Sequence, residues 1–244
     1  MIQKIVLFII SIFDYFYQKK FFIFLKKRGF NKFDLFLDVG AHRGESIKLF
    51  SNNFEINKII SFEASPINFN FLQSQEKIYS KKFNKTKIVI ENIALGSKNK
   101  SVEFKHFNES SSSTIKNIDE DSQYFKKKFK LLNFFNNKNI YQKFEIKIQK
   151  LHDYLKQKNI NSVDFLKIDT EGYEYEILLG LEDKIKLINI IMFEHHYDNM
   201  IKKEYTFRDI HSLLVANKFK SIYKSRMPFR KTFEYIYINK ELLN

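Results

Sequence analysis

The stretch Asp38-Val39-Gly40-Ala41-His42-Arg43-Gly44-Glu45 decides the fold. It follows an apolar run at residues 34–39, which is typical of a buried strand, and it precedes a helical pattern at residues 46–54. A glycine-containing turn between a strand and a helix is the setting in which α/β proteins bind nucleotide-like ligands. Gly40 permits a tight turn and a close backbone approach, and Gly44 lets the next helix pack closely.

A second signal for an adenosine ligand lies after the next strand, at residues 58–62. Glu63 ends that strand, and an acid at this position can accept hydrogen bonds from both ribose hydroxyls. The alternative is a structural carboxylate ahead of the helix that Pro66 begins. His42 replaces the middle glycine of a G-x-G-x-x-G turn, which argues against a pyrophosphate cradle. The residues expected to bind a cofactor here are Asp38, Gly40, Ala41, His42, Gly44, Glu63 and Ala64.

The rest of the chain alternates strand patterns with helical ones. Further strands are expected at residues 87–93, 101–104, 144–148, 163–168, 187–193, 219–223 and 233–238, with helices at 66–75, 173–181 and 205–217. This alternation predicts an α/β fold whose sheet is mostly parallel, with helices on both faces. The short connection between the last two strands predicts an antiparallel C-terminal edge strand. After the third strand, Asn92, Ile93 and Ala94 are expected to flank the adenine.

The first 30 residues form an apolar and basic segment, expected to be helical, ahead of a single domain at residues 31–244. Asp14, Lys19 and Lys20 interrupt the apolar run, which therefore falls short of the roughly 20 residues that span a membrane. No cleavage site of a signal peptide is visible, so we expect a cytoplasmic protein. Aromatic residues beside lysine clusters suit a helix lying on the inner, anionic face of a membrane, and packing on the domain is an equal alternative.

Charge and composition narrow the classes of partner and chemistry. The net charge is +14, which attracts polyanions, but A/T-rich codon bias also explains a chain with 28 Phe and many Lys residues. We therefore do not expect nucleic acid as the main partner. The chain has no Cys, which excludes disulfides, thiolate metal sites and thiol nucleophiles.

Charged residues follow the later strands, where open α/β sheets bind their ligands. Lys167, Asp169 and Glu171 alternate, so they are expected to share one side of an extended stretch. Glu194 and His195 end the neighbouring strand, and His195 is a candidate general base. We take these five residues as the candidate catalytic group.

Each of these residues also has a structural alternative. Asp169 or Thr170 would cap the following helix, Glu171 would favour its positive end, and His195 would be a hydrogen-bonded core residue. Asp169 with Glu194 or His195 also offers oxygen and imidazole ligands for a hard divalent cation. No ligand spacing fixes such a site, so a metal is not predicted.

Taken together, these motifs resemble those of the FkbM methyltransferases. FLDVGAHRGES at residues 36–46 is similar to the family's D-V-G-A-N-x-G, with His42 in place of the Asn. VDFLKIDTEGYEYEILLG at residues 163–180 closely resembles the hallmark K-I-D-V-E-G-x-E. SFEASPINFNFL at 61–72, ENIALG at 91–96 and LHDYL at 151–155 are similar to F-E-P-x-P, N-x-A-L-G and L-D-D-x-L. The resemblance runs from about residue 33 to residue 238.

The resemblance implies a Rossmann-like class I fold with a seven-stranded sheet and S-adenosyl-L-methionine as the cofactor. It also implies O-methylation of a hydroxyl on a sugar, a glycan or glycolipid precursor, or a similar small molecule. Ser112 and Ser113 stand where the family carries a Ser pair, so they are expected near the ligand, within a variable insertion at about residues 106–142.

Two competing functions remain. An RNA-binding or RNA-modifying methyltransferase would use the positive charge. An NAD-dependent oxidoreductase on the same kind of sheet is disfavoured by the missing middle glycine.

Overall fold

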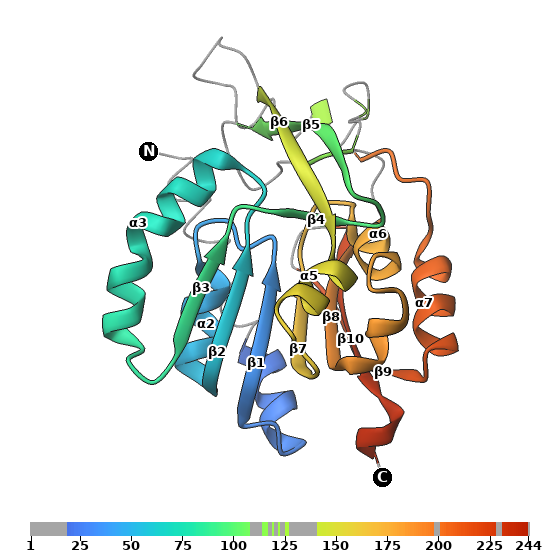
Figure 1. The fold of residues 1–244 in the computed structure, drawn as a ribbon. Coiled ribbons are helices and arrows are strands. Elements are labelled where there is room, and N and C mark those ends of the chain that lie inside the picture. Colours follow the sequence, from blue (N-terminus) through green and yellow to red (C-terminus); the bar gives the residue numbers. More distant parts are fainter. Residues whose placement is uncertain are drawn as a thin grey trace.

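A seven-stranded sheet forms the centre of the protein (Figure 1), in the order β3-β2-β1-β7-β8-β10-β9. The computed structural model describes residues 19–107, 114–116, 119, 122, 125–126, 141–197, 201–227 and 231–243. The strands of this sheet are β1 (Lys32–Val39), β2 (Glu55–Phe62), β3 (Lys87–Glu91), β7 (Val163–Ile168), β8 (Ile188–His196), β9 (Phe219–Arg226) and β10 (Thr232–Asn239).

Five neighbouring strands, β3, β2, β1, β7 and β8, run parallel, and β10 is antiparallel to both of its neighbours. The prediction of an α/β fold with a mostly parallel sheet and an antiparallel C-terminal strand is confirmed. The antiparallel strand lies one place inside the edge. After β9 the chain turns back over a short connection, and β10 enters between β9 and β8.

Alternating side chains divide the sheet into two apolar faces, as the period of an extended strand requires. On β1, Leu37 packs in a core that includes α5 (Leu151–Gln157), α6 (Glu174–Leu179) and α7 (Phe207–Ala216). Phe36 packs in the other core, against α2 (Glu45–Asn53) and α3 (Pro66–Lys82). We call these the α5–α7 face and the α2–α3 face.

A separate small sheet lies over the carboxyl ends of the central strands (Figure 1). Its strands are β4 (Ala94–Gly96), β6 (Tyr141–Lys150) and β5 (Lys100–Phe107), in that order. The strands expected at 101–104 and 144–148 are confirmed, but they pair with each other here and not in the main sheet. The expected insertion connects β5 with β6, and Ser112 and Ser113 within it lie outside the described residues.

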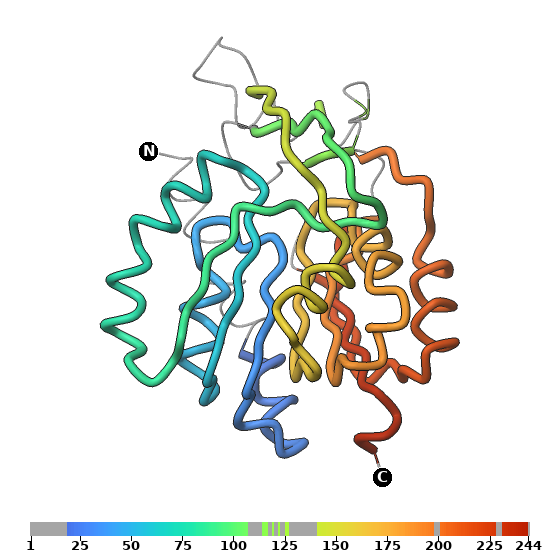
Figure 2. Tube along the Cα trace, in the orientation of Figure 1, coloured from blue at the N-terminus to red at the C-terminus, as the bar shows by residue number. Residues whose placement is uncertain are grey.

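Residues 19–27 are helical, lie at the end of the molecule from which β1 starts (blue in Figure 2), and pack on the α2–α3 face. The rings of Phe21 and Phe22 lie with their centroids 5.9 and 5.6 Å from that of Phe50 in α2. For this part of the N-terminal segment, the structure shows packing on the domain, while residues 1–18 lie outside the description. Among the described helices, none is both long and apolar enough to cross a membrane.

Replacing Leu25 with Ala is expected to lower the free energy of unfolding by about 2–5 kcal/mol. Leu25 is fully buried, and the smaller side chain would leave a cavity between the helix and the sheet. The matched control is Ile23→Ala in the same helix, where the side chain is 43% exposed and the expected change is within about 0.5 kcal/mol. Urea denaturation measures both. Equal losses in the two variants would show that this helix is not part of the core.

Candidate functional site

The turn between β1 and α2 is shaped by two glycines with left-handed backbone conformations. Gly40 has a φ of 83°, and a Cβ atom there would lie 1.9 Å from the carbonyl oxygen of Asp169. Gly44 has a φ of 90°, and a Cβ atom there would lie 2.7 Å from Leu72 Cδ1 in α3. Since both contacts and both angles exclude larger residues, glycine is required at each position. Gly44 was expected to let the next helix pack on the sheet, but its close neighbours are side chains of α3.

Glu63 directly follows β2 and ties this turn to the loop before α3. One carboxylate oxygen accepts the backbone N–H of His42 at 2.7 Å, and the other accepts the N–H of Ser65 at 2.8 Å. Each oxygen of a carboxylate can accept more than one hydrogen bond, so the group can also bind ligand hydroxyls. Burial raises the pKa of Glu63 to about 7, and the hydrogen bonds from Ser65 and His42 oppose this only in part.

Asn92 lies beside this acid but binds the backbone. Its side-chain amide donates to the main-chain oxygen of Glu63 at 2.8 Å, so Asn92 holds the loop that carries the acid. The other residues expected at this end are packed rather than polar: Ala41 is buried on the α2–α3 face, Ala94 is buried in β4, and Ala64 and Ile93 are half-buried against the core. The structure therefore gathers the expected cofactor residues that it describes at one end of the sheet.

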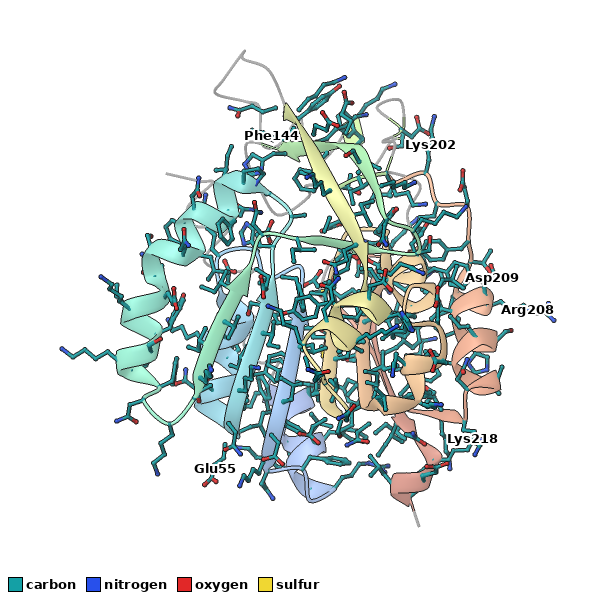
Figure 3. All side chains as sticks on the ribbon, in the orientation of Figure 1. Glu55, Phe144, Lys202, Arg208, Asp209 and Lys218 are labelled. Atoms are coloured by element: carbon teal, nitrogen blue, oxygen red, sulfur yellow. The ribbon has the colours of Figure 1, made fainter. Side chains whose placement is uncertain are left out.

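The ionisable side chains of Asp38, Lys167 and Asp169 form a line across the carboxyl ends of β1 and β7. Surface charges such as Arg208 and Lys218 point away from the molecule (Figure 3), whereas this line is largely enclosed. Lys167 Nζ lies 3.8 Å from Asp38 Oδ1 and 2.9 Å from Asp169 Oδ2. Asp38 is fully buried, and within the described part of the chain neither of its carboxylate oxygens makes a hydrogen bond. Burial raises the pKa of Asp38 to about 6, against the opposing charge of Lys167.

Asp169 is the most exposed member of this line. Its side chain is 31% exposed, compared with 11% for Lys167 and 0% for Asp38. Burial would raise the pKa of Asp169, but the charge and the hydrogen bond of Lys167 outweigh it and hold the pKa below its usual value. Asp169 therefore presents an ionised carboxylate at the end of β7.

The loop between Asp169 and α6 is held by an acid at the first position of that helix. The buried carboxylate of Glu174 accepts the N–H of Gly172 at 2.9 Å and the hydroxyl of Thr170 at 3.3 Å. The hydroxyl of Tyr205 donates to its other oxygen. The N-cap position of α6 is Tyr173 and no side chain makes a capping hydrogen bond there, so the alternative in which Asp169 or Thr170 caps α6 does not describe this structure.

His195 requires a correction. His195 lies two residues after Phe193 on the same strand, so its side chain also lies on the α5–α7 face. There it is 3% exposed. Its ring lies 4.7 Å from that of Tyr197 and 5.8 Å from that of Phe207. Burial lowers its pKa to about 3, so the imidazole stays neutral. The buried ring lies on the face of β8 away from Asp169, which favours the alternative of a core histidine over a general base.

His196 is the imidazole at this site that the sequence reasoning missed. Its Nε2 lies 3.3 Å from Glu171 Oε2, and its Nδ1 lies 3.0 Å from Thr232 Oγ1. Glu171 has a φ of 50°, so the extended stretch that was expected to align it with Lys167 ends before it. Residues two apart on a strand share a face, so the sequence pattern predicts that His196, and not His195, lies on the same face as Glu194.

Glu194 lies on the α2–α3 face, opposite Glu234 of β10 in the strand register. Burial raises the pKa of Glu194 well above its usual range, and the charges of Asp169 and Glu234 raise it further. The surroundings thus raise the pKa of Glu194 and lower that of Asp169. Two acids whose environments separate their pKa values in this way are suited to different roles, one as a proton donor and one as an acceptor.

Replacing Glu194 with Gln is expected to flatten the dependence of stability on pH. A carboxyl group with a raised pKa lowers stability as the pH rises from its unfolded-state pKa to its folded-state pKa, because only the unfolded chain ionises freely there. The amide cannot ionise, so the variant should lose less stability than the wild type between pH 5 and pH 8. Urea denaturation at several pH values tests this. Parallel curves for the two proteins would mean that Glu194 ionises normally.

The alternative of a hard cation bound by Asp169 with Glu194 or His195 gains no support from this geometry. In the described ranges, no group of three or more His, Cys, Asp or Glu side chains has a metal-binding arrangement. His195 faces the other side of β8, and Lys167 is bound to Asp169.

The strand order, with an acid after β2 and another after β7, defines the fold of the class I, S-adenosylmethionine-dependent methyltransferases. The sequence profile of the methyltransferase FkbM domain matches residues 38–221. The chain belongs to the FkbM methyltransferase family.

A solved structure shows the same fold at low sequence identity. Methyltransferase FkbM from Methylobacillus flagellatus KT is 13% identical with a TM-score of 0.55, and the match covers 84% of this chain and 43% of that one. This chain thus spans less than half of that protein. Magnesium protoporphyrin IX methyltransferase from Synechocystis PCC 6803, with bound SAM, is 9% identical (TM-score 0.49), and the match covers 91% and 77% of the two chains. No curated protein sequence matches this chain.

Proposed function

We propose that this protein transfers the methyl group of S-adenosylmethionine to a hydroxyl of a sugar, a glycan or glycolipid precursor, or a similar small molecule. The observation that carries the proposal is the ionised, partly exposed carboxylate of Asp169, held by Lys167 at the same sheet end as Glu63. Membership of the FkbM family supports methyl transfer, and the chemistry of this carboxylate supports a hydroxyl as the acceptor.

The residues at the donor end fit S-adenosylmethionine. The carboxylate of Glu63 would accept the ribose hydroxyls, beside the backbone turn at Gly40. The buried carboxylate of Asp38, without hydrogen bonds in the described part of the chain, suits the positively charged methionine portion. The donor supplies an electrophilic methyl group on a sulfonium centre.

At the acceptor end, the residues would position the hydroxyl and receive its proton. The acceptor oxygen forms a bond to the methyl carbon while the carbon–sulfur bond breaks. The electron pair of the broken bond stays on sulfur. The hydroxyl proton passes to Asp169, whose charge Lys167 balances. The sulfonium is already a good leaving group, so positioning provides most of the rate and a weak base is sufficient. Protonated Glu194 would donate a hydrogen bond to a neighbouring oxygen of the acceptor.

The experiment that tests this function uses methyl-labelled S-adenosylmethionine with three acceptor classes: free sugars, glycolipids in vesicles, and RNA. We expect label in a sugar or glycolipid as a methyl ether. Label in RNA would favour the RNA-modifying alternative, which the net charge of +14 supports because RNA is a polyanion. Transfer to amines alone would overturn the assignment of O-methylation.

A further inference from the structure

A hydrogen bond between two buried side chains joins the small sheet to the donor end of the site. His106 of β5 is 5% exposed, Ser65 is 0% exposed, and His106 Nδ1 lies 2.9 Å from Ser65 Oγ. A buried polar group that loses its partner is costly, so each of these side chains depends on the other.

Ser65 has two further contacts, and both lie beside Glu63. Its backbone N–H donates to Glu63 Oε1 at 2.8 Å, and its hydroxyl oxygen accepts the N–H of Asn68 at 3.3 Å, which makes Ser65 the N-cap of α3. Besides the bond from Asn68, the hydroxyl has its proton and a second lone pair, so it can bind Nδ1 of His106 in either tautomer of the imidazole. The histidine therefore holds the side-chain conformation that starts α3 and places the N–H bound by Glu63.

We infer that His106 is a positioning residue for the methyl donor, which holds Glu63 through Ser65 in the orientation that binds the ribose. The inference rests on the proposed function, because it assumes a ribose at Glu63. Only one of the two backbone donors to Glu63 belongs to Ser65, and the other belongs to His42. Loss of His106 should therefore weaken donor binding without abolishing it.

Calorimetry with S-adenosylhomocysteine tests this in the full chain. His106→Ala should weaken binding by about 5- to 100-fold, the range for one buried hydrogen bond left unmade. His106→Asn places an amide where Nδ1 lies and should restore most of the affinity. The matched control is Phe104→Leu, a 5% exposed core position two residues earlier on the same strand, which should change affinity by less than about twofold.

The outcomes separate the inference from the function on which it rests. Wild-type protein that does not bind S-adenosylhomocysteine overturns both. Wild-type binding with unchanged affinity in His106→Ala overturns the inference alone. Equal weakening in His106→Ala, His106→Asn and Phe104→Leu also overturns it, because general damage to the small sheet would then explain the loss. If His106→Ala does not fold, His106→Gln replaces it, since its amide reaches the position of Nε2 and should not restore binding.

Discussion

Replacing Asp169 with Asn is expected to lower kcat by about 10²- to 10⁴-fold while leaving donor affinity nearly unchanged. The amide keeps the shape of the side chain but cannot take the proton of the acceptor hydroxyl. Lys167 keeps one partner in the variant, since Asp38 lies 3.8 Å from its Nζ. Steady-state kinetics with the acceptor found by labelling measures kcat, and calorimetry with S-adenosylhomocysteine measures the donor end.

The control for this prediction is Asp183→Asn, the same chemical change at a side chain that is 61% exposed. It should leave both quantities unchanged. Since Asp169 makes no capping hydrogen bond to α6, a loss of turnover in Asp169→Asn cannot be assigned to a lost helix cap. A folded Asp169→Asn protein with full turnover would remove Asp169 from the catalytic group.

Replacing Glu63 with Ala is expected to weaken binding of S-adenosylhomocysteine by about 1.5–3 kcal/mol, on the order of 10- to 150-fold. The variant loses the charged acceptor for the ribose hydroxyls and leaves the N–H groups of His42 and Ser65 without it. Calorimetry measures the change. Unchanged affinity would mean that the ribose does not lie at this acid.

The pH dependence of binding gives a second test of Glu63. Its pKa of about 7 means that the carboxyl group is protonated at pH 6 and ionised at pH 8. The ionised form is the stronger acceptor and has no proton on either oxygen, so wild-type affinity should rise as the pH passes through 7. Glu63→Gln, which cannot ionise, should bind more weakly and lack this rise. The same rise in the Gln variant would assign it to another group, such as Asp38.

Features that depend on neighbours along the chain could be predicted from the amino-acid sequence. The strand–turn–helix unit from Asp38 to Gly44 was predictable because a left-handed backbone angle requires glycine. The central strands were predictable because buried parallel strands form continuous apolar runs. The sequence also allowed the prediction that His196, and not His195, lies on the face of Glu194, because side chains alternate along a strand. The ionisable residues at the carboxyl ends of β7 and β8 were predictable for the same reason.

Only the tertiary structure decided which of these residues meet. It paired β5 with β6 in a separate sheet, placed Lys167 between Asp38 and Asp169, and brought His106 to Ser65. It also separated the pKa values of Asp169 and Glu194, because one faces Lys167 closely and the other faces further acids. The periodicity of apolar residues in the sequence indicates on which face of a helix or strand a side chain lies. Long-range strand pairing and burial decide which groups lie across from it, and charge interactions depend on those distances.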